Sequence, residues 1–346
     1  MPHLFAPLSL RGVTVRNRVV MSPMAMWSAG QDGLATDWHF AHYAARAVGG
    51  VGLIIMEATA VEERGRISVH DLGLWDERQL EPLARIVRFC HEQGAAIAPQ
   101  LAHAGRKAFS PERGVGPQMA VAPSAVPAEE GWVVPQALTT AQIDEIVTAF
   151  GAAARRAGQV GFDAIEVHAA HGYLLHEFLS PLANRREDAY GGPLENRARA
   201  LLRVVDAIRE VWPEEKPLLV RLSATDWAAG GLTIEDTVQV ATWLKAHGVD
   251  LADCSSGGIL PTPPPSIGPG YQVPFAATVR REAQIPTVAV GLITTPELAE
   301  EIVSNGRADM VALGRELLRD PCWPLHAAHA LGQEVAWPWQ YEPAKP

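Results

Sequence analysis

The chain has 346 residues, 48% of them hydrophobic, and its 29 basic against 39 acidic residues give a formal net charge of −10 at pH 7. Such an acidic chain lacks the basic surface that binds nucleic acid or an anionic membrane, and no apolar run reaches the roughly 18 residues of a membrane span. The first ten residues lack the apolar stretch of a signal peptide. The three cysteines, Cys90, Cys254 and Cys322, are too scattered to build a disulfide framework or a metal site by themselves. We therefore expect a soluble, cytoplasmic protein whose partners are neither nucleic acid nor membrane.

Short apolar runs recur along the chain, and each is followed by a segment with helical periodicity. The runs predict strands at residues 19–22, 52–58, 95–100, 162–168, 218–223, 249–255, 287–291 and 309–314. The segments between them predict helices at residues 37–48, 77–92, 141–158, 194–211, 234–246, 275–282 and 296–305. Thr233 and Thr295 precede two of these helices as N-caps. Most of the strands are continuously hydrophobic, which is typical of parallel strands buried on both faces.

Strands that alternate with helices in this way predict an α/β fold, a (β/α)8 TIM barrel built as one domain over residues 1–346. A doubly wound sheet is the alternative, but no G-x-G-x-x-G follows the first strand and no Walker sequence is present. Residues 8–15 predict a hairpin that closes the bottom of the barrel. Two loops, residues 103–140 after the third strand and 259–274 after the sixth, are longer than ordinary connections. Both leave the carboxyl ends of strands, where barrel active sites lie, so we expect them over the active site.

Candidate functional residues cluster where the predicted strands end, and in a barrel these positions converge on one site. In chain order they are Ser22 with Pro23 and Met24, Gln100, His168, His171, Tyr173, Arg221, Ser255 with Ser256, Gly257 and Gly258, and Gly314 with Arg315. The set holds no carboxylate pair of the kind that a glycosidase requires. Glu166 shares a strand with His168, and we expect it to point to the opposite face.

The pair His168 and His171 has three interpretations. The two imidazoles could bind a metal, although no third ligand and no H-E-x-x-H helix supports this. They could also be hydrogen-bonded core histidines. We favour two imidazole donors that hold one substrate oxygen, with the Tyr173 hydroxyl nearby as an acid, because this set suits polarising a carbonyl and protonating the carbon next to it. No metal is then expected.

Glycines after the last strands indicate a phosphate site. Gly291 follows the seventh strand and Gly314-Arg315 the eighth, and in barrels the loops after these strands often bind phosphate through backbone N–H groups. Arg315 adds a bidentate donor, and Ser256, Gly257 and Gly258 could add further N–H groups. Together these residues predict a phosphorylated cofactor.

Several longer motifs extend these strand ends. They are Ser22-Pro23-Met24, Asp37-Trp38-His39, Glu57-Ala58-Thr59-Ala60, the segment 100–107, His168-Ala-Ala-His171-Gly172-Tyr173-Leu174, the segment 188–197 and Val311-Ala-Leu-Gly314-Arg315. With these motifs the chain resembles the old yellow enzymes, which are FMN-dependent ene-reductases, and in particular their short thermophilic-like branch. The elements H-x-x-H-G-Y and Y-G-G-x-L-E-N-R, in this order, are highly specific to that family.

The resemblance implies an NADPH dehydrogenase of the ene-reductase type, with FMN across the barrel mouth and NADPH or NADH as co-substrate. It implies isoalloxazine contacts for Ser22, Pro23, Met24, Ala25, Ala58 and Gln100, a place beside the flavin N1/O2 edge for Arg221, and phosphate contacts for Gly314 and Arg315. Trp27 and Ile67 would line the substrate site. His168 and His171 would bind the oxygen of an activated alkene, and Tyr173 would supply the proton. The family also implies a homodimer or homotetramer, with residues 333–346 at a subunit interface.

Three positions depart from the branch. Ala25 stands where a flavin-tuning Cys is usual, and Trp27 where Tyr is usual. Pro343 replaces the Arg that enters a neighbouring subunit's site, so this finger is absent or replaced by Lys345. Two rival functions remain open: a metal-dependent hydrolase built on His168 and His171, and a flavin-binding redox sensor without turnover.

Overall fold

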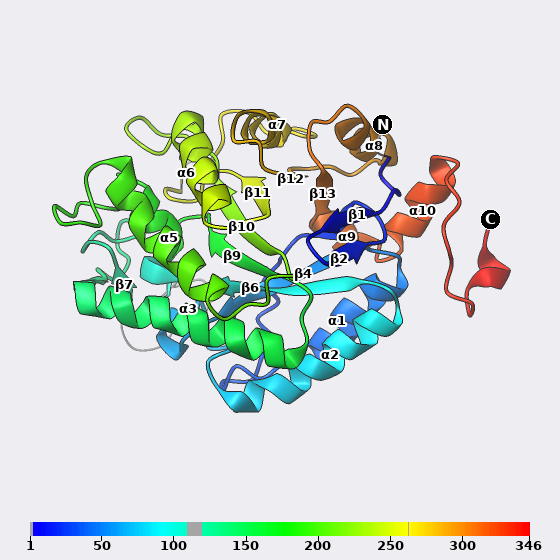
Figure 1. Cartoon of the computed structure of the whole chain (residues 1–346), viewed down its shortest axis with the longest axis horizontal. Coiled ribbons are helices and arrows are strands. Elements are labelled where there is room, and N and C mark those ends of the chain that lie inside the picture. The colour runs from blue at the N-terminus through cyan, green and yellow to red at the C-terminus, as the bar shows by residue number, and fades with distance from the viewer. Residues whose placement is uncertain (1–2, 109–119, 262) are drawn as a thin grey trace.

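The strands form a closed parallel barrel in a computed structural model that describes residues 3–108, 120–261 and 263–346 (Figure 1). Within these residues the barrel strands are β3 (Val19–Met21), β4 (Leu53–Ala60), β6 (Ala96–Ala102), β9 (Ile165–Ala169), β10 (Leu218–Ser223), β11 (Leu251–Ser255), β12 (Thr287–Val290) and β13 (Met310–Leu313). Each pairs in parallel with the next, and β13 pairs with β3, which closes the ring. A short strand, β5 (Leu72–Gly73), extends β4. The predicted (β/α)8 barrel is confirmed, and the doubly wound alternative is excluded because such a sheet stays open.

Helices surround the strands at the positions that the periodicity predicts (Figure 1). They are α1 (Asp37–Val48), α2 (Leu80–Glu92), α3 (Thr140–Val160), α5 (Leu194–Arg209), α6 (Ile234–Ala246), α7 (Val273–Glu282) and α8 (Pro296–Ser304). Both predicted N-caps form, since the side chain of Thr233 accepts the N–H of Asp236 and that of Thr295 accepts the N–H of Leu298. The sequence prediction missed α4 (Leu174–Leu179), α9 (Arg315–Arg319) and α10 (Trp323–Ala330). Every residue of α4 is buried, so this helix has no polar face from which a helical period could be read.

Inward-facing side chains fill the amino-terminal half of the barrel with an apolar layer. It includes Val20, Leu53, Ala98, Ala164, Leu219, Leu251, Val288 and Met310. Below it, β1 (Leu8–Leu10) and β2 (Val13–Val15) form an antiparallel hairpin whose Leu10 and Val15 pack into the same layer. The prediction that this hairpin closes the barrel bottom is therefore confirmed. A larger apolar cluster lies between the strands and the surrounding helices.

The two long loops lie on the carboxyl-terminal side of the barrel. The loop after β6 contains η3 (Gly105–Lys107) and the short parallel pair β7 (Val121–Ala122) and β8 (Gln136–Ala137), while its residues 109–119 lie outside the described residues. Residue 262 of the loop after β11 is also outside them. Lys107, Glu129 and Trp132 of the first loop line one cavity together with Gly258, which directly precedes the second loop. The expected position over the site is thus confirmed for the described residues of the first loop, and for residues 259–274 it stays a prediction.

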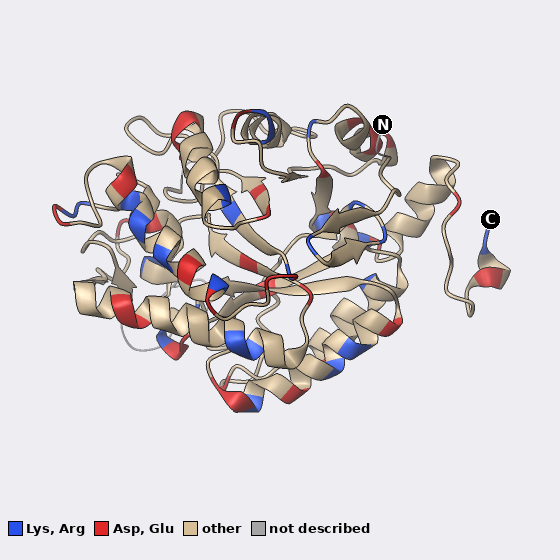
Figure 2. Ribbon diagram, viewed as in Figure 1, with Lys and Arg blue, Asp and Glu red and all other residues tan. Residues whose placement is uncertain are grey.

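Basic and acidic residues are intermixed along the outer helices in the ribbon of Figure 2. Of the helices formed by described residues, none combines the length and the apolarity that crossing a membrane requires. After α10, residues 334–340 border two cavities together with Arg16 and Gly50, and the chain ends in η5 (Glu342–Ala344) at one side of the molecule in Figure 1. Trp339 in this segment is 78% exposed, and Lys345 pairs with Glu334 of the same segment at 3.0 Å.

Candidate active site

A cavity of about 440 Å³ opens at the carboxyl ends of the barrel strands. The structure brings nine of the predicted site residues into its lining, namely Pro23, Ala25, Ala58, Ile67, Gln100, His168, His171, Tyr173 and Arg221. Gly258, one of the strand-end candidates, also lines it, as do Lys107, Glu129 and Trp132, which were not assigned from the sequence. Residues from the ends of five barrel strands, from the long loop after β6 and from the segment just after β11 therefore meet around one space.

The predicted substrate residues come from the end of β9 and the turn after it. His168 is within the strand, His171 has a left-handed backbone with φ of 59°, and Tyr173 is the N-cap of α4. The His168 ring lies 5.3 Å from that of His171 and 4.9 Å from that of Tyr173, centroid to centroid, with edge-to-face geometry in both pairs. The strand end, the left-handed residue and the helix start thus gather three rings that the sequence separates by up to five positions.

Both imidazoles are held neutral. Burial first, and then the positive charge of Arg221, lower the pKa of His168 and of His171 well below the ordinary value. Within the described part of the chain, Nδ1 of His168 is buried without a hydrogen-bond partner, whereas Nε2 of His171 lies 2.7 Å from the hydroxyl of Ser255. No described residue therefore competes with a ligand oxygen for Nδ1 of His168, while at His171 a ligand oxygen must use Nδ1 or compete with Ser255.

A buried polar layer forms the floor of the cavity. Arg221 places Nε 3.0 Å from Asp253 and donates a terminal N–H to Ser22 at 3.3 Å. Gln100 donates to Glu166 at 2.8 Å. Burial, reinforced by the negative charge of Asp253 and opposed by Arg221, raises the pKa of Glu166 to about 8, so this acid is largely protonated at neutral pH.

The orientation expected for Glu166 was wrong. Residues two apart on a strand share a face, so Glu166 points inward with His168 and with Ala164 of the apolar layer. The metal hypothesis gains no ligand from this position, because the described residues contain no cluster of three His, Cys, Asp or Glu side chains suited to a metal ion.

Comparison with known proteins decides the family. Residues 3–334 match the NADH:flavin oxidoreductase / NADH oxidase family. The chain belongs to this family, that of the old yellow enzymes. It is 53% identical over 345 residues to an NADPH dehydrogenase of Listeria innocua, with 99% of each chain covered. Among solved structures, morphinone reductase matches with a TM-score of 0.82 and 32% identity, over 96% of this chain and 91% of that one.

A longer structural relative shows the same barrel within a larger chain. The complex of a 2-naphthoyl-CoA reductase with 2-naphthoyl-CoA matches with a TM-score of 0.87 and 27% identity. The match covers 96% of this chain but only 52% of the relative. As a member of the family, the present chain is an oxidoreductase that uses FMN and a nicotinamide dinucleotide.

The cavity floor fits the polar edge of FMN. The Nε2 donor of Gln100 is turned to Glu166, which leaves its carbonyl oxygen as an acceptor toward the cavity. Arg221 supplies a buried positive charge, which suits the N1/O2 edge of a flavin. The methyl side chains of Ala25 and Ala58 leave room for a planar ring between them and the substrate residues.

Residues predicted for the phosphate lie beside one another outside the cavity lining. Ser256 donates to the side chain of Gln272 at 2.6 Å, and Gln272 in turn donates to the carbonyl of Val290 at 3.3 Å. Gly291 follows with a left-handed φ of 130°, and a Cβ there would lie 3.2 Å from the backbone nitrogen of Gln272 and from the ring of Tyr271. Burial raises the pKa of the Tyr271 hydroxyl, and the positive charge of Arg315 opposes this rise. A backbone nitrogen, a hydroxyl and the charge of Arg315 thus border one region, which suits a phosphate.

The other predicted flavin residues extend this region along β13 and β3. A Cβ on Gly314 would lie 3.5 Å from the sulfur of Met24 and 3.9 Å from Cβ of Ser22. Gly257, which follows β11, has φ of 68° and donates its N–H to the carbonyl of Thr225 at 2.8 Å, so in this structure that N–H is engaged and does not face a phosphate.

The wall around Ala25 depends on an irregularity in β4. The pairing of β4 with β6 shifts register between Ile55 and Ala58, so Ala58 faces the cavity and Glu57 faces α1. There Glu57 accepts the N–H of Met26 at 2.8 Å and the hydroxyl of Tyr43 at 3.1 Å, which anchors the segment that carries Ala25. Trp27, predicted from the sequence to line the substrate site, has φ of 48°, is 40% exposed and lies outside the cavity lining.

The residues that the sequence prediction missed come mainly from the loop after β6. Lys107 donates to the carbonyls of His171 and Gly258 at 2.7 and 2.6 Å, and its ammonium lies 5.5 Å from the Tyr173 ring centroid. The motif at residues 100–107 contains Lys107 and was a usable signal. Glu129 and Trp132 lie in an irregular segment without periodicity, and only the path of the loop brings them to the cavity.

Proposed function

We propose that the chain is an FMN-dependent ene-reductase, in which NADPH or NADH reduces FMN and the electrons then reduce the C=C bond of an α,β-unsaturated carbonyl or nitro compound. One observation carries the proposal: His168, His171 and Tyr173 meet in a cavity whose floor holds Arg221. The name NADPH dehydrogenase of the Listeria innocua relative supports the nicotinamide half of the reaction. When bound, FMN supplies the hydride chemistry.

The histidines hold the electron-withdrawing oxygen of the alkene. Both are neutral donors because burial and Arg221 lower their pKa, so each can share a ring N–H with a carbonyl or nitro oxygen. At His168 no described residue competes with that oxygen for Nδ1. A donor aimed at the oxygen draws electron density from the double bond and favours attack at the β carbon.

Tyr173 and Arg221 handle the proton and the charge. The Tyr173 hydroxyl gives its proton to the α carbon, beside the oxygen held by His168, whose ring centre is 4.9 Å from that of Tyr173. Arg221, buried in the floor with Asp253, offsets the negative charge that arrives with the electrons. The walls exclude water and fix the alkene in one orientation.

The test separates this function from its two rivals. The purified protein should show flavin absorbance, lose it on anaerobic addition of NADPH and regain it with cyclohexenone or N-methylmaleimide. A colourless protein that hydrolyses esters in a metal-dependent way would support the hydrolase built on His168 and His171. Bleaching without reoxidation by any activated alkene would support the redox sensor.

We also propose that residues 1–346 form one FMN-binding barrel domain of a cytoplasmic homodimer or homotetramer, with residues 333–346 at the subunit interface. The exposed indole of Trp339 supports an interface there, because large exposed apolar side chains mark contact surfaces. Lys345 is engaged by Glu334 of its own chain, so Lys345 does not extend as the branch's Arg finger does. Light scattering of the full chain and of Trp339→Ser should give different masses, and equal masses would argue against this interface.

A further inference from the structure

A fully buried histidine lies behind the turn that carries the substrate residues. His176 is on α4, and its Nδ1 accepts the backbone N–H of Gly172 at 2.9 Å. Since a backbone N–H only donates, Nδ1 must be the ring nitrogen without hydrogen. Nε2 then carries the hydrogen and lies 2.9 Å from Asp226 Oδ1. The ring therefore connects the turn after β9 to the segment after β10 in one fixed tautomer.

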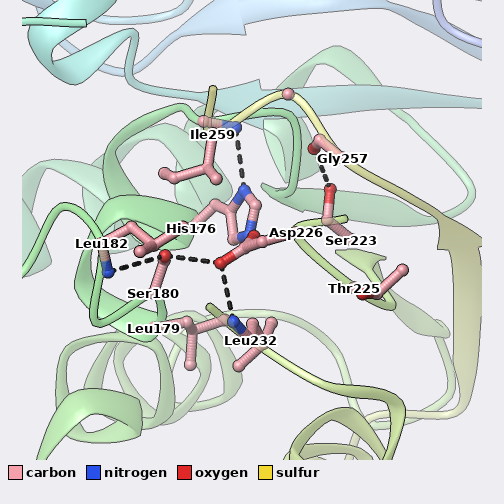
Figure 3. A network of polar contacts seen from close by, with 12 residues as sticks. His176, Leu179, Ser180, Leu182, Ser223, Thr225, Asp226, Leu232, Gly257 and Ile259 are labelled. Atoms are coloured by element: carbon pink, nitrogen blue, oxygen red, sulfur yellow. Dashed lines mark hydrogen bonds and ion pairs between the residues drawn. The ribbon is translucent and has the colours of Figure 1, made fainter. Parts of the chain in front are cut away.

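Asp226 is itself held from the other side. Its Oδ2 accepts the hydroxyl of Ser180 at 2.6 Å and the N–H of Leu232 at 2.7 Å, and Figure 3 shows the side chains of His176 and Ser180 pointing toward Asp226. Burial alone would raise the pKa of Asp226, but the hydrogen bonds from His176, Ser180 and Leu232 outweigh it and lower the pKa. Asp226 is therefore a carboxylate whose other oxygen faces His176.

The turn that His176 holds is constrained at its other backbone atoms as well. His171 and Gly172 both have left-handed backbones, with φ of 59° and 73°. The N–H of His171 is bonded to Ser223 at 2.9 Å, and its carbonyl accepts from Lys107 at 2.7 Å. A Cβ on Gly172 would collide with the carbonyl oxygen of Gly258. Without an acceptor at His176, the Gly172 N–H would be buried and unpaired, and the turn could relax from this conformation.

We propose that His176 is a positioning residue for Tyr173 and His171, acting through the Gly172 N–H, and that Asp226 fixes the His176 ring for this task. His176 lies outside the cavity lining and is separated from the alkene by the turn. Its effect is to set the direction of the Tyr173 hydroxyl relative to His168. The proposal rests on the proposed ene-reductase function, because it assigns His176 to the step in which Tyr173 gives up its proton.

Two substitutions separate the two bonds of the ring. His176→Asn places an oxygen at the position of Nδ1 and keeps an acceptor for Gly172 while losing Asp226. His176→Gln reaches the position of Nε2 and keeps a donor for Asp226, but leaves Gly172 without an acceptor. Ser180→Ala is the matched control, since it removes one bond to Asp226 without altering the ring.

The kinetic readout uses the FMN-bound enzyme and both half-reactions. In His176→Gln, reoxidation by cyclohexenone should slow at least about 10-fold, a part of the 10²–10⁴ that a positioned acid contributes, while reduction by NADPH should stay near that of the unsubstituted enzyme. His176→Asn and Ser180→Ala should both recover most of the reoxidation rate. Equal losses in Asn and Gln variants, or losses that follow the melting temperature across all three, would overturn the proposal and leave His176 a purely structural residue.

Hydrogen exchange of the FMN-bound protein provides a readout that needs no alkene. The peptide containing Gly172 should exchange faster in His176→Gln than in His176→Asn, and Ser180→Ala should resemble the unsubstituted protein. If the protein is bleached by NADPH but no alkene reoxidises it, the proposed function fails, whereas the order of exchange still decides whether His176 holds the turn. The same exchange rate in both His176 variants would refute that role.

Discussion

Tyr173→Phe should slow alkene reduction and leave flavin reduction by NADPH nearly unchanged. Phenylalanine keeps the ring that packs edge-on to His168 at 4.9 Å and lies 5.5 Å from the Lys107 ammonium, so the change is confined to the hydroxyl. A positioned acid contributes about 10²–10⁴ in rate, which corresponds to about 2.7–5.4 kcal/mol of activation free energy. Only reoxidation by the alkene uses this proton, so the whole effect should fall on that step.

Stopped-flow absorbance of the flavin measures the two half-reactions separately. Reduction by NADPH should proceed at the original rate, and reoxidation by cyclohexenone should fall by the factor above. Substrates whose α carbanion is well stabilised, such as nitroalkenes, should lose less because they depend less on the acid. If both half-reactions slow equally, or if neither changes, Tyr173 is not the proton donor. A retained KM for the alkene would show that the hydroxyl does not act mainly in binding.

Three further predictions concern the same site. His168→Ala should weaken binding of a phenol inhibitor by roughly 10- to 150-fold, which corresponds to the about 1.5–3 kcal/mol of a hydrogen bond to a charged group. His171→Ala should weaken this binding less, because Ser255 already engages Nε2 of His171. Titration with the inhibitor, followed by visible absorbance, tests this order. Ala25→Cys should shift the two-electron midpoint potential of the bound flavin by tens of millivolts, where about 30 mV equals 1.4 kcal/mol. Dye-equilibration titration measures this shift, and enone turnover is measured beside it. An inactive Ala25 enzyme with an active Cys variant would contradict the prediction. Burial raises the pKa of Glu177 to about 8. Above its ordinary pKa this carboxyl loses its proton in the unfolded chain but keeps it in the folded protein, so the free energy of unfolding should fall as pH rises from about 4.5 to 8. Glu177→Gln, which keeps an acceptor for the Arg106 N–H, should therefore gain apparent thermal stability over the unsubstituted protein as pH rises, and a pH-independent difference would refute the assignment.

The sequence by itself determined the architecture and most of the cavity lining. Continuous apolar runs alternating with amphipathic segments require strands buried on both faces and helices outside them, and that pattern is local. Residues at the ends of such strands converge whatever the loops do, so the strand pattern alone was enough to assign Gln100, His168 and Arg221 to one site. The motif around His171 and Tyr173 then indicated the family and its cofactor.

The tertiary structure decided which side chains face one another. The register shift in β4 reversed the faces of Glu57 and Ala58, and such a shift depends on the neighbouring strand rather than on the local pattern. Glu129 and Trp132 reach the cavity only through the path of a long loop, which no periodicity describes. The bonds of His176 to Gly172 and Asp226 join the ends of two strands. Pairings of this kind depend on the distance between strand ends in space, and a sequence pattern reports burial along one element but not the partner across the barrel.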